Sequence, residues 1–244
     1  NIEGFSKPES VFMNRRKYKV KGKNIFVTGA SGLLGAALTK LLIQEAANVW
    51  VLINQSDVNI HGVTKVELKD LKDGKRLPHF DVVFHLAAMI SSDSKEELQL
   101  FNANVLLTQR LCAELNFDRI VYSSTVSLHG STTAAIVETS QINPHNAYAH
   151  SKLWGEHYVQ QCDSFAILRF SSIYGVGIKD GVFISRAIEQ ALTNGAVTIM
   201  GDGERLQNYI HTDTAIDYLV CAAKVNNNVV GLAVSTTSHS NRNI

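Results

Sequence analysis

The 244-residue sequence has few cysteines, no long apolar run and almost no net charge, and each shortage excludes a class of protein. Its three cysteines are odd in number and far apart, which fits neither a disulfide framework nor a zinc site. We expect them to be reduced and mostly buried. No apolar stretch approaches the roughly 20 residues of a membrane-spanning helix, and the N-terminus lacks the apolar core of a signal peptide. These absences favour a soluble, cytoplasmic protein.

A net charge of +1 leaves no overall field that would attract nucleic acid or an anionic membrane. A small molecule is therefore the expected partner. Lys7 to Lys23 nevertheless carries seven basic residues before the first expected strand. We expect residues 1–23 to form a solvated basic arm, and docking to an acidic partner is the alternative.

Apolar runs rich in valine, isoleucine and phenylalanine alternate with stretches of helical periodicity, as in the βαβ units of a parallel sheet. The expected strands cover residues 24–28, 48–53, 65–69, 81–87, 119–124 and 165–171. Helices are expected at 33–46, 95–115 and 147–161. Because the strands are apolar almost throughout, both faces of the sheet should be covered. The sequence thus predicts an α/β protein with a Rossmann-type doubly wound parallel sheet over residues 24–175.

The pattern changes after Gly175. A helix is expected at 182–192, followed by the short strands "VTIMG" and "NYIHT" and a helix at 213–224. Residues 176–244 should form a small substrate-binding lobe, interleaved with the last elements of the main sheet. The sequence ends soon after an apolar, strand-like run with no helix to cover it, which leaves open whether this lobe is complete.

The segment "TGASGLLG" directly follows the first expected strand. A glycine-rich turn between a strand and a helix is an anion site, because unpaired backbone N–H groups and the positive end of the helix dipole converge there. Gly29 would permit the tight turn, Gly32 would let a pyrophosphate reach the backbone, and Gly35 would let the helix pack on the strand. The GxxGxxG spacing in this position predicts a dinucleotide cofactor.

The residue expected to hold the adenosine ribose lies at the end of the second strand, where NAD-binding proteins usually have an acid. Here it is Asn54, which can bond ribose hydroxyls but neither repels nor neutralises a 2′-phosphate. The nearby Asp57 would disfavour that phosphate. We expect NAD, and NADP stays an alternative.

Tyr148 and Lys152 lie four residues apart in a helical stretch and therefore on one face. An ammonium group nearby would stabilise the phenolate and lower its pKa, so that Tyr148 could exchange a proton with a substrate hydroxyl. The strand "VYSST" ends at Thr125, at the carboxyl edge of the sheet where ligands bind. We expect the Thr125 hydroxyl to bond the reacting oxygen.

Together, TGxxGxxG, "HLAA", "YSST", YxxxK and "LRFSSIYGVG" resemble, in order and spacing, the extended short-chain dehydrogenase/reductase family, in its NAD-dependent epimerase/dehydratase group. The resemblance implies a Rossmann domain that binds NAD(P) and a C-terminal lobe that binds a nucleotide-linked sugar. It implies Thr125, Tyr148 and Lys152 as catalytic residues. By position, it implies cofactor contacts from Gly29, Ser31, Gly32, Leu33, Leu34, Gly35, Asn54, Asp70, Leu71, Leu86, Ala87, Ala88, Asn104, Tyr148, Lys152 and Phe170.

The chain departs from the family pattern at the substrate side. Dehydratases of the group carry an acidic pair after the catalytic threonine, whereas Val126 and Ser127 follow here, so dehydration is not expected. The usual asparagine and arginine that face the nucleotide sugar are replaced by Ser172 and Gln207, with Arg205 as a displaced cation. Losing the arginine weakens diphosphate binding, because a neutral amide forms no charge-assisted pair. Thr125, Ser172 and Gln207 are the expected substrate contacts.

We therefore expect an NAD-dependent epimerase that acts on a nucleotide-linked sugar through a transient keto intermediate. One alternative is an NAD(P)H-dependent reductase or dehydrogenase of a keto sugar or another small carbonyl compound. A second is a non-catalytic dinucleotide-binding sensor. The histidines show no ligand spacing, so no metal site is expected. The resemblance also implies a homodimer that packs the helices at 95–115 and 147–161 into a four-helix bundle.

Overall fold

The computed structural model describes residues 19–53, 58–71, 77–91, 93–132, 134–178, 183–199 and 201–243. Seven parallel strands form the main sheet in the order β3-β2-β1-β4-β5-β6-β9. The strands are β1 (Asn24–Thr28), β2 (Asn48–Ile53), β3 (Val63–Glu67), β4 (Val82–His85), β5 (Ile120–Thr125), β6 (Phe165–Phe170) and β9 (Val229–Ala233). Because the order reverses between β1 and β4, their carboxyl ends leave a crevice for a ligand, as in dinucleotide-binding sheets.

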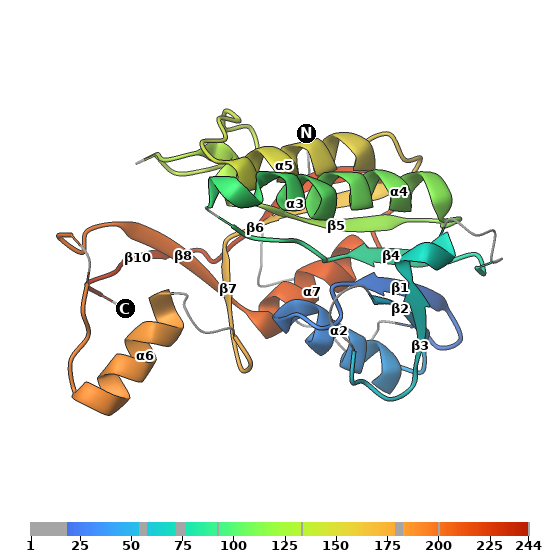
Figure 1. Cartoon of the computed structure of the whole chain (residues 1–244), viewed down its shortest axis with the longest axis horizontal. Helices are drawn as coiled ribbons and strands as arrows, with labels where there is room; N and C mark the ends of the chain where they lie inside the picture. The colour runs from blue at the N-terminus through green and yellow to red at the C-terminus, as the bar shows by residue number, and fades with distance from the viewer. Residues whose placement is uncertain are drawn as a thin grey trace.

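Helices cover both faces of this sheet (Figure 1). Helices α2 (Leu33–Gln44) and α7 (Thr212–Ala222) lie on one face, and α3 (Glu97–Phe101), α4 (Leu107–Glu114) and α5 (Ala147–Val159) lie on the other. Successive strand residues point to opposite faces, so Ile25 and Val27 pack with the α2 side while Phe26 packs with the α4 side. This confirms the prediction that the strands are covered on both faces.

A small lobe beside the main sheet is built on a three-stranded sheet of order β10-β8-β7 (Figure 1). It comprises β7 (Ser172–Tyr174), β8 (Leu206–His211), β10 (Ser238–Ser240) and helix α6 (Phe183–Asn194). Strand β8 pairs in parallel with β7 and antiparallel with β10. No residue of α6 is buried, and Leu192 is 82% exposed.

Most expected elements form, with shifted ends. The strand expected at 65–69 begins two residues earlier, as β3. The long helix expected at 95–115 is interrupted: a 3₁₀ turn (Ser94–Glu96) precedes α3, and a π-helical turn (Asn102–Leu106) joins α3 to α4. The segment "VTIMG" was expected to be a strand, but its residues 197–199 have no regular structure. No helix among the described residues is long and apolar enough to span a membrane.

Candidate active site

In the glycine turn between β1 and α2, other backbone atoms lie so close to two of the glycines that neither position has room for a side chain. Gly29 has φ 74°, and a Cβ there would lie 2.7 Å from the backbone nitrogen of Ala87. A Cβ on Gly35 would collide with the carbonyl oxygen of Gly29. Gly29 and Gly35 are therefore required by packing, and they hold the start of α2 against the loop after β4.

The start of α2 offers backbone donors to a ligand. Gly32 is the N-cap residue, and no side chain caps the helix. The first amides of a helix have no intrahelical partner, so this uncapped end fits a pyrophosphate. Ser31 is exposed, Leu33 is half-buried, and Leu34 reaches the cavity described next. The dinucleotide that the sequence predicts therefore fits this turn.

A cavity of about 430 Å³ lies between the carboxyl edge of the main sheet and the small lobe. The predicted site residues that line it are Leu34, Leu86, Ala88, Thr125, Tyr148, Lys152, Phe170, Ser172 and Gln207. The other lining residues were not among the predicted site residues: Ile90, Ser123, Ser124, Val126, Ser127, Ser171, Ile173, Ile178, Phe183, Ile184 and Tyr209. The structure thus brings the expected catalytic, cofactor-side and substrate-side residues to one cavity.

Tyr148 enters this cavity from the first turn of α5. The Asn146 side chain caps that helix by accepting a hydrogen bond from the backbone N–H of Ala149 at 2.8 Å. Burial raises the pKa of Tyr148 to about 12, and a hydrogen bond with the Thr125 side chain opposes the rise. Thr125 also accepts from the Ser127 backbone N–H at 3.1 Å, which fixes its hydroxyl at the end of β5.

Lys152 lies one turn after Tyr148 and is 1% exposed. Its Nζ stands 4.1 Å from the centre of the Tyr122 ring, within range of a cation–π interaction. Burial lowers the pKa of Lys152 to about 7, and the Glu156 carboxylate opposes this shift. The prediction that Lys152 lowers the pKa of Tyr148 is wrong for the protein alone, because burial dominates at Tyr148 and the ammonium faces another ring.

Glu156 continues the same face of α5, and sequence reasoning missed it. Its carboxylate accepts from the Ser124 hydroxyl at 2.6 Å and forms a two-pronged pair with Arg169, at 2.9 and 2.8 Å. Both charged side chains are buried. This network ties α5 to β5 and β6 directly behind Tyr148 and Lys152. The i+4 spacing from Lys152 and an arginine in an apolar strand were the available signals.

Three other predicted cofactor contacts, Asn104, Asp70 and Leu71, do not line the cavity. Asn104 is buried; its side chain accepts from the Met89 backbone N–H at 2.7 Å and donates to the Met89 carbonyl at 2.9 Å and to Ser151 Oγ at 2.9 Å. It thereby holds the loop after β4 against α5. Asp70 and Leu71 lie in a 3₁₀ turn after β3, where Asp70 accepts from the Glu67 N–H at 3.0 Å. Their contacts with a cofactor stay predictions. Asn54 lies outside the described residues.

The far wall of the cavity comes from β7 and β8. Ser172 is the register partner of Tyr209, and Gln207 Oε1 accepts a hydrogen bond from the Tyr209 hydroxyl at 2.7 Å. Arg205 is exposed and does not line the cavity. Across the described part of the chain, no group of three or more potential metal ligands occurs. The substrate side thus presents hydroxyl and amide groups.

Comparison with known proteins adds three findings. A sequence model of the NAD dependent epimerase/dehydratase family matches residues 25–233. The protein described as the uncharacterized UDP-glucose epimerase YtcB of Bacillus subtilis (strain 168) is 28% identical over 220 residues, 79% of this chain and 70% of the relative. A putative UDP-glucose 4-epimerase of Methanocaldococcus jannaschii is 27% identical over 240 residues, 89% of this chain and 79% of that one.

Among solved structures, UDP-glucuronic acid 4-epimerase from Bacillus cereus, in complex with UDP-glucuronic acid and NAD, is similar with a TM-score of 0.77. The identity is 25%, and the match covers 90% of this chain and 80% of that one. The similarity therefore includes both the main sheet and the small lobe.

Proposed function

Because the chain belongs to the NAD-dependent epimerase/dehydratase family, we propose that it is an NAD-dependent epimerase acting on a nucleotide-linked sugar. One observation carries the proposal: a single cavity joins Leu34 of the glycine turn to Tyr148 and, across the gap, to Gln207 of the lobe. Two of the relatives that match this chain bear the names of UDP-glucose epimerases, and the solved relative from Bacillus cereus holds both UDP-glucuronic acid and NAD.

Residues 24–175 would hold the cofactor. The backbone of the Gly29–Gly35 turn would bind the pyrophosphate, and Leu86, Ala88 and Phe170 would form the wall beside the ring. NAD, when bound, supplies a hydride acceptor and a positively charged nicotinamide. Lys152 would bind the nicotinamide ribose, as the family resemblance implies.

Tyr148 would take the proton from a sugar hydroxyl and later return it. Its raised pKa keeps the phenol protonated in the free enzyme, so a positive charge must enter the cavity before the phenol becomes a base. Thr125 would orient the same hydroxyl by hydrogen bonding. The Glu156–Arg169 pair holds α5 against β6 and so keeps Tyr148 in place at the cavity.

Residues 176–244 would bind the nucleotide sugar, through Gln207 and Tyr209 together with Ser172 of β7. Val126 and Ser127 line the cavity where an acidic pair would serve elimination of water, so epimerisation is favoured over dehydration. The neutral Gln207 predicts weaker contact with the diphosphate than an arginine would give.

The test is to incubate the purified protein with NAD and UDP-glucose or UDP-glucuronic acid and to follow epimer formation by NMR. We expect the 4-epimer from one of these sugars and a loss of about 10²-fold or more in kcat for Tyr148→Phe. Consumption of NADPH with a keto sugar, without any epimer, would show a reductase instead. Unchanged turnover of Tyr148→Phe would remove the proposed mechanism, and NAD binding without turnover would indicate a sensor.

A homodimer is the proposed assembly. Leu98, Phe101 and Trp154 are exposed apolar residues on α3 and α5, the helices expected to meet a second copy. Sedimentation analysis should give twice the mass of one chain, and Trp154→Glu should shift it towards one. A cytoplasmic location stays a prediction from the sequence.

A further inference from the structure

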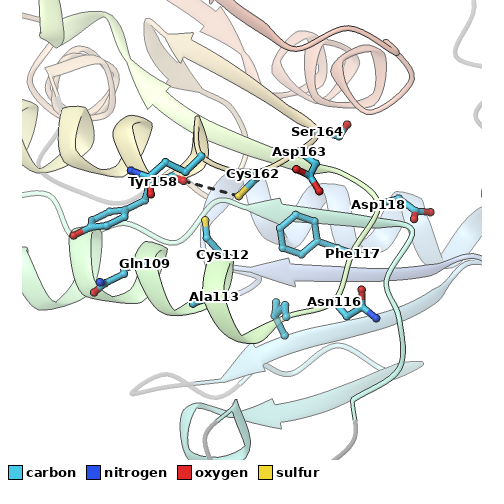
Figure 2. Close-up of a pocket in the computed structure, with 12 residues that line it drawn as sticks. Gln109, Cys112, Ala113, Asn116, Phe117, Asp118, Tyr158, Cys162, Asp163 and Ser164 are labelled. Atoms are coloured by element: carbon cyan, nitrogen blue, oxygen red, sulfur yellow. Dashed lines mark hydrogen bonds between the residues drawn. The ribbon is translucent and has the colours of Figure 1, made fainter.

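A second cavity, of about 500 Å³, lies at the opposite edge of the main sheet, where β5 and β6 begin (Figure 2). The ends of α4 and α5 border it, and its lining includes Cys112, Tyr158 and Cys162. Tyr148 is at the other end of α5, about 20 Å away at 1.5 Å per helical residue. The cavity is therefore separate from the proposed active site.

Two cysteine side chains face each other in this cavity (Figure 2). Cys112 is on α4, and Cys162 follows α5 in the turn before β6. The two thiols lie near enough to shift each other's pKa, and Cys162 Sγ also donates to the Tyr158 carbonyl oxygen at 3.9 Å. Both are half-buried, whereas we expected mostly buried thiols, so a small oxidant can reach them. Fifty positions apart in the sequence, they are neighbours only in the fold.

We propose that Cys112 and Cys162 form a dithiol site that a hydroperoxide oxidises to a reversible disulfide. The inference needs only the placement of α4 and α5, so it is independent of the proposed epimerase activity. A metal is not the occupant, because two thiols are too few ligands and no third joins them among the described residues.

The interaction between the two thiols makes them unequal. Contact with Cys112 lowers the pKa of Cys162, while the same contact together with burial raises the pKa of Cys112. Burial and, to a smaller extent, Asp163 oppose the lowering of the pKa at Cys162. Thiolate is the reactive form, so Cys162 is the residue that attacks the oxidant and Cys112 the one that resolves the product.

The oxidation balances in two steps. The Cys162 thiolate attacks one peroxide oxygen, so that an S–O bond forms, the O–O bond breaks and the leaving hydroxide takes a proton to become water, or an alcohol for an alkyl hydroperoxide. Cys112 then loses its proton and attacks the sulfenic sulfur of Cys162. The S–S bond forms, the S–O bond breaks, and a second oxygen leaves as water. Two thiols lose two electrons, and the peroxide gains them.

The disulfide would link α4 to the turn after α5 and close a loop of about 50 residues that contains β5 and all of α5. Closing such a loop restricts the unfolded chain more than the folded one. We expect the midpoint of thermal unfolding to rise by about 5 °C or more in the oxidised protein.

The test counts free thiols in the whole, folded chain before and after an excess of hydrogen peroxide. N-ethylmaleimide should label all three cysteines of the reduced protein and one, Cys221, after oxidation. Peptide mapping should show Cys112 joined to Cys162, and dithiothreitol should restore three labels. Three labels after peroxide, a bridge to Cys221 or between two chains, or sulfinic acid at either thiol would overturn the proposal.

Matched variants distinguish formation of the Cys112–Cys162 disulfide from oxidation of cysteines in general. Cys221→Ser should keep the bridge and the thermal shift. Cys112→Ser should abolish both and leave a sulfenic acid at Cys162 that dimedone traps. If Cys112→Ser still shows the thermal shift after peroxide, the disulfide is not its cause and the proposed site is wrong. Circular dichroism of each variant checks that it folds like the parent.

Discussion

The two sheets contribute opposite kinds of surface to the proposed active site. On the side of the main sheet, Lys152 and Glu156 of α5 and Arg169 of β6 are ionisable, buried and held by partners. On the small lobe, Gln207 and Tyr209 are half-exposed, and α6 buries no residue. The proton-transfer end of the cavity is therefore positioned by the core, whereas the sugar end depends on a lightly packed wall. We expect stability and chemistry to be sensitive to changes in the first region and substrate affinity to changes in the second.

The largest effect should come from breaking the buried ion pair. Glu156→Ala leaves the Arg169 charge buried without its carboxylate, and this should lower the free energy of unfolding by about 3–5 kcal/mol. Urea unfolding measures the change. Glu114→Ala is the matched control, because Glu114 pairs with Arg110 in a partly exposed i,i+4 pair on α4 and should cost about 0.5 kcal/mol or less. Equal losses in the two variants would contradict a core-held active site.

Lys152 should give a smaller effect with a distinctive pH dependence. Its pKa is about 7 in the folded protein, against a model-compound value of 10.5, so the unfolded chain binds more protons between these pH values. The stability of the wild type should therefore rise with pH across this window. Lys152→Met should be more stable than wild type by about 2–4 kcal/mol near pH 7, and the gain should fade towards pH 10.

Urea unfolding at a series of pH values measures this difference, with exposed Lys40→Met as the control. A gain that does not change with pH would show that Lys152 is not desolvated as the structure indicates. A gain shared by Lys40→Met would make it a general effect of removing a lysine.

At the lobe, Gln207→Ala should change binding rather than stability. It removes the acceptor of the Tyr209 hydroxyl from the proposed sugar-binding wall, so KM should rise about 10-fold while kcat changes little. Steady-state kinetics with whichever UDP-sugar the NMR assay shows to be epimerised measures both constants. Glu204→Ala, exposed and outside the cavity, should leave them unchanged. A fall in kcat with KM unchanged would show that Gln207 acts in the chemical step and not in substrate binding.

The smallest effect is expected on α6. Ile188→Ala removes an apolar side chain that is 56% exposed, and the free energy of unfolding should change by about 0.5 kcal/mol or less. Leu38→Ala, on α2 and fully buried, should cost about 2–5 kcal/mol under the same conditions. A large loss from Ile188→Ala would show that α6 is covered in solution.

Local patterns predicted much of the fold and part of the candidate site. A continuous apolar run placed β2 at its observed bounds, because a strand covered on both faces is apolar at nearly every position, here at all but Asn48. The long helix at 95–115 was less well predicted, because the π-helical turn that interrupts it has no distinct sequence pattern. Strand β7 was missed because three residues carry too little pattern, and its partner β8 comes more than thirty residues later.

By itself, the sequence determined the glycine turn at the start of α2 and the shared face of Tyr148 and Lys152. Each depends on spacings of three or four residues along one helix or turn, which the backbone geometry converts directly into position. Only the tertiary structure decided that Lys152 faces Tyr122, that Glu156 pairs with Arg169 and that Cys112 meets Cys162. These contacts join elements that are distant along the chain, and their partners are set by how helices pack on the sheet, which no local spacing encodes.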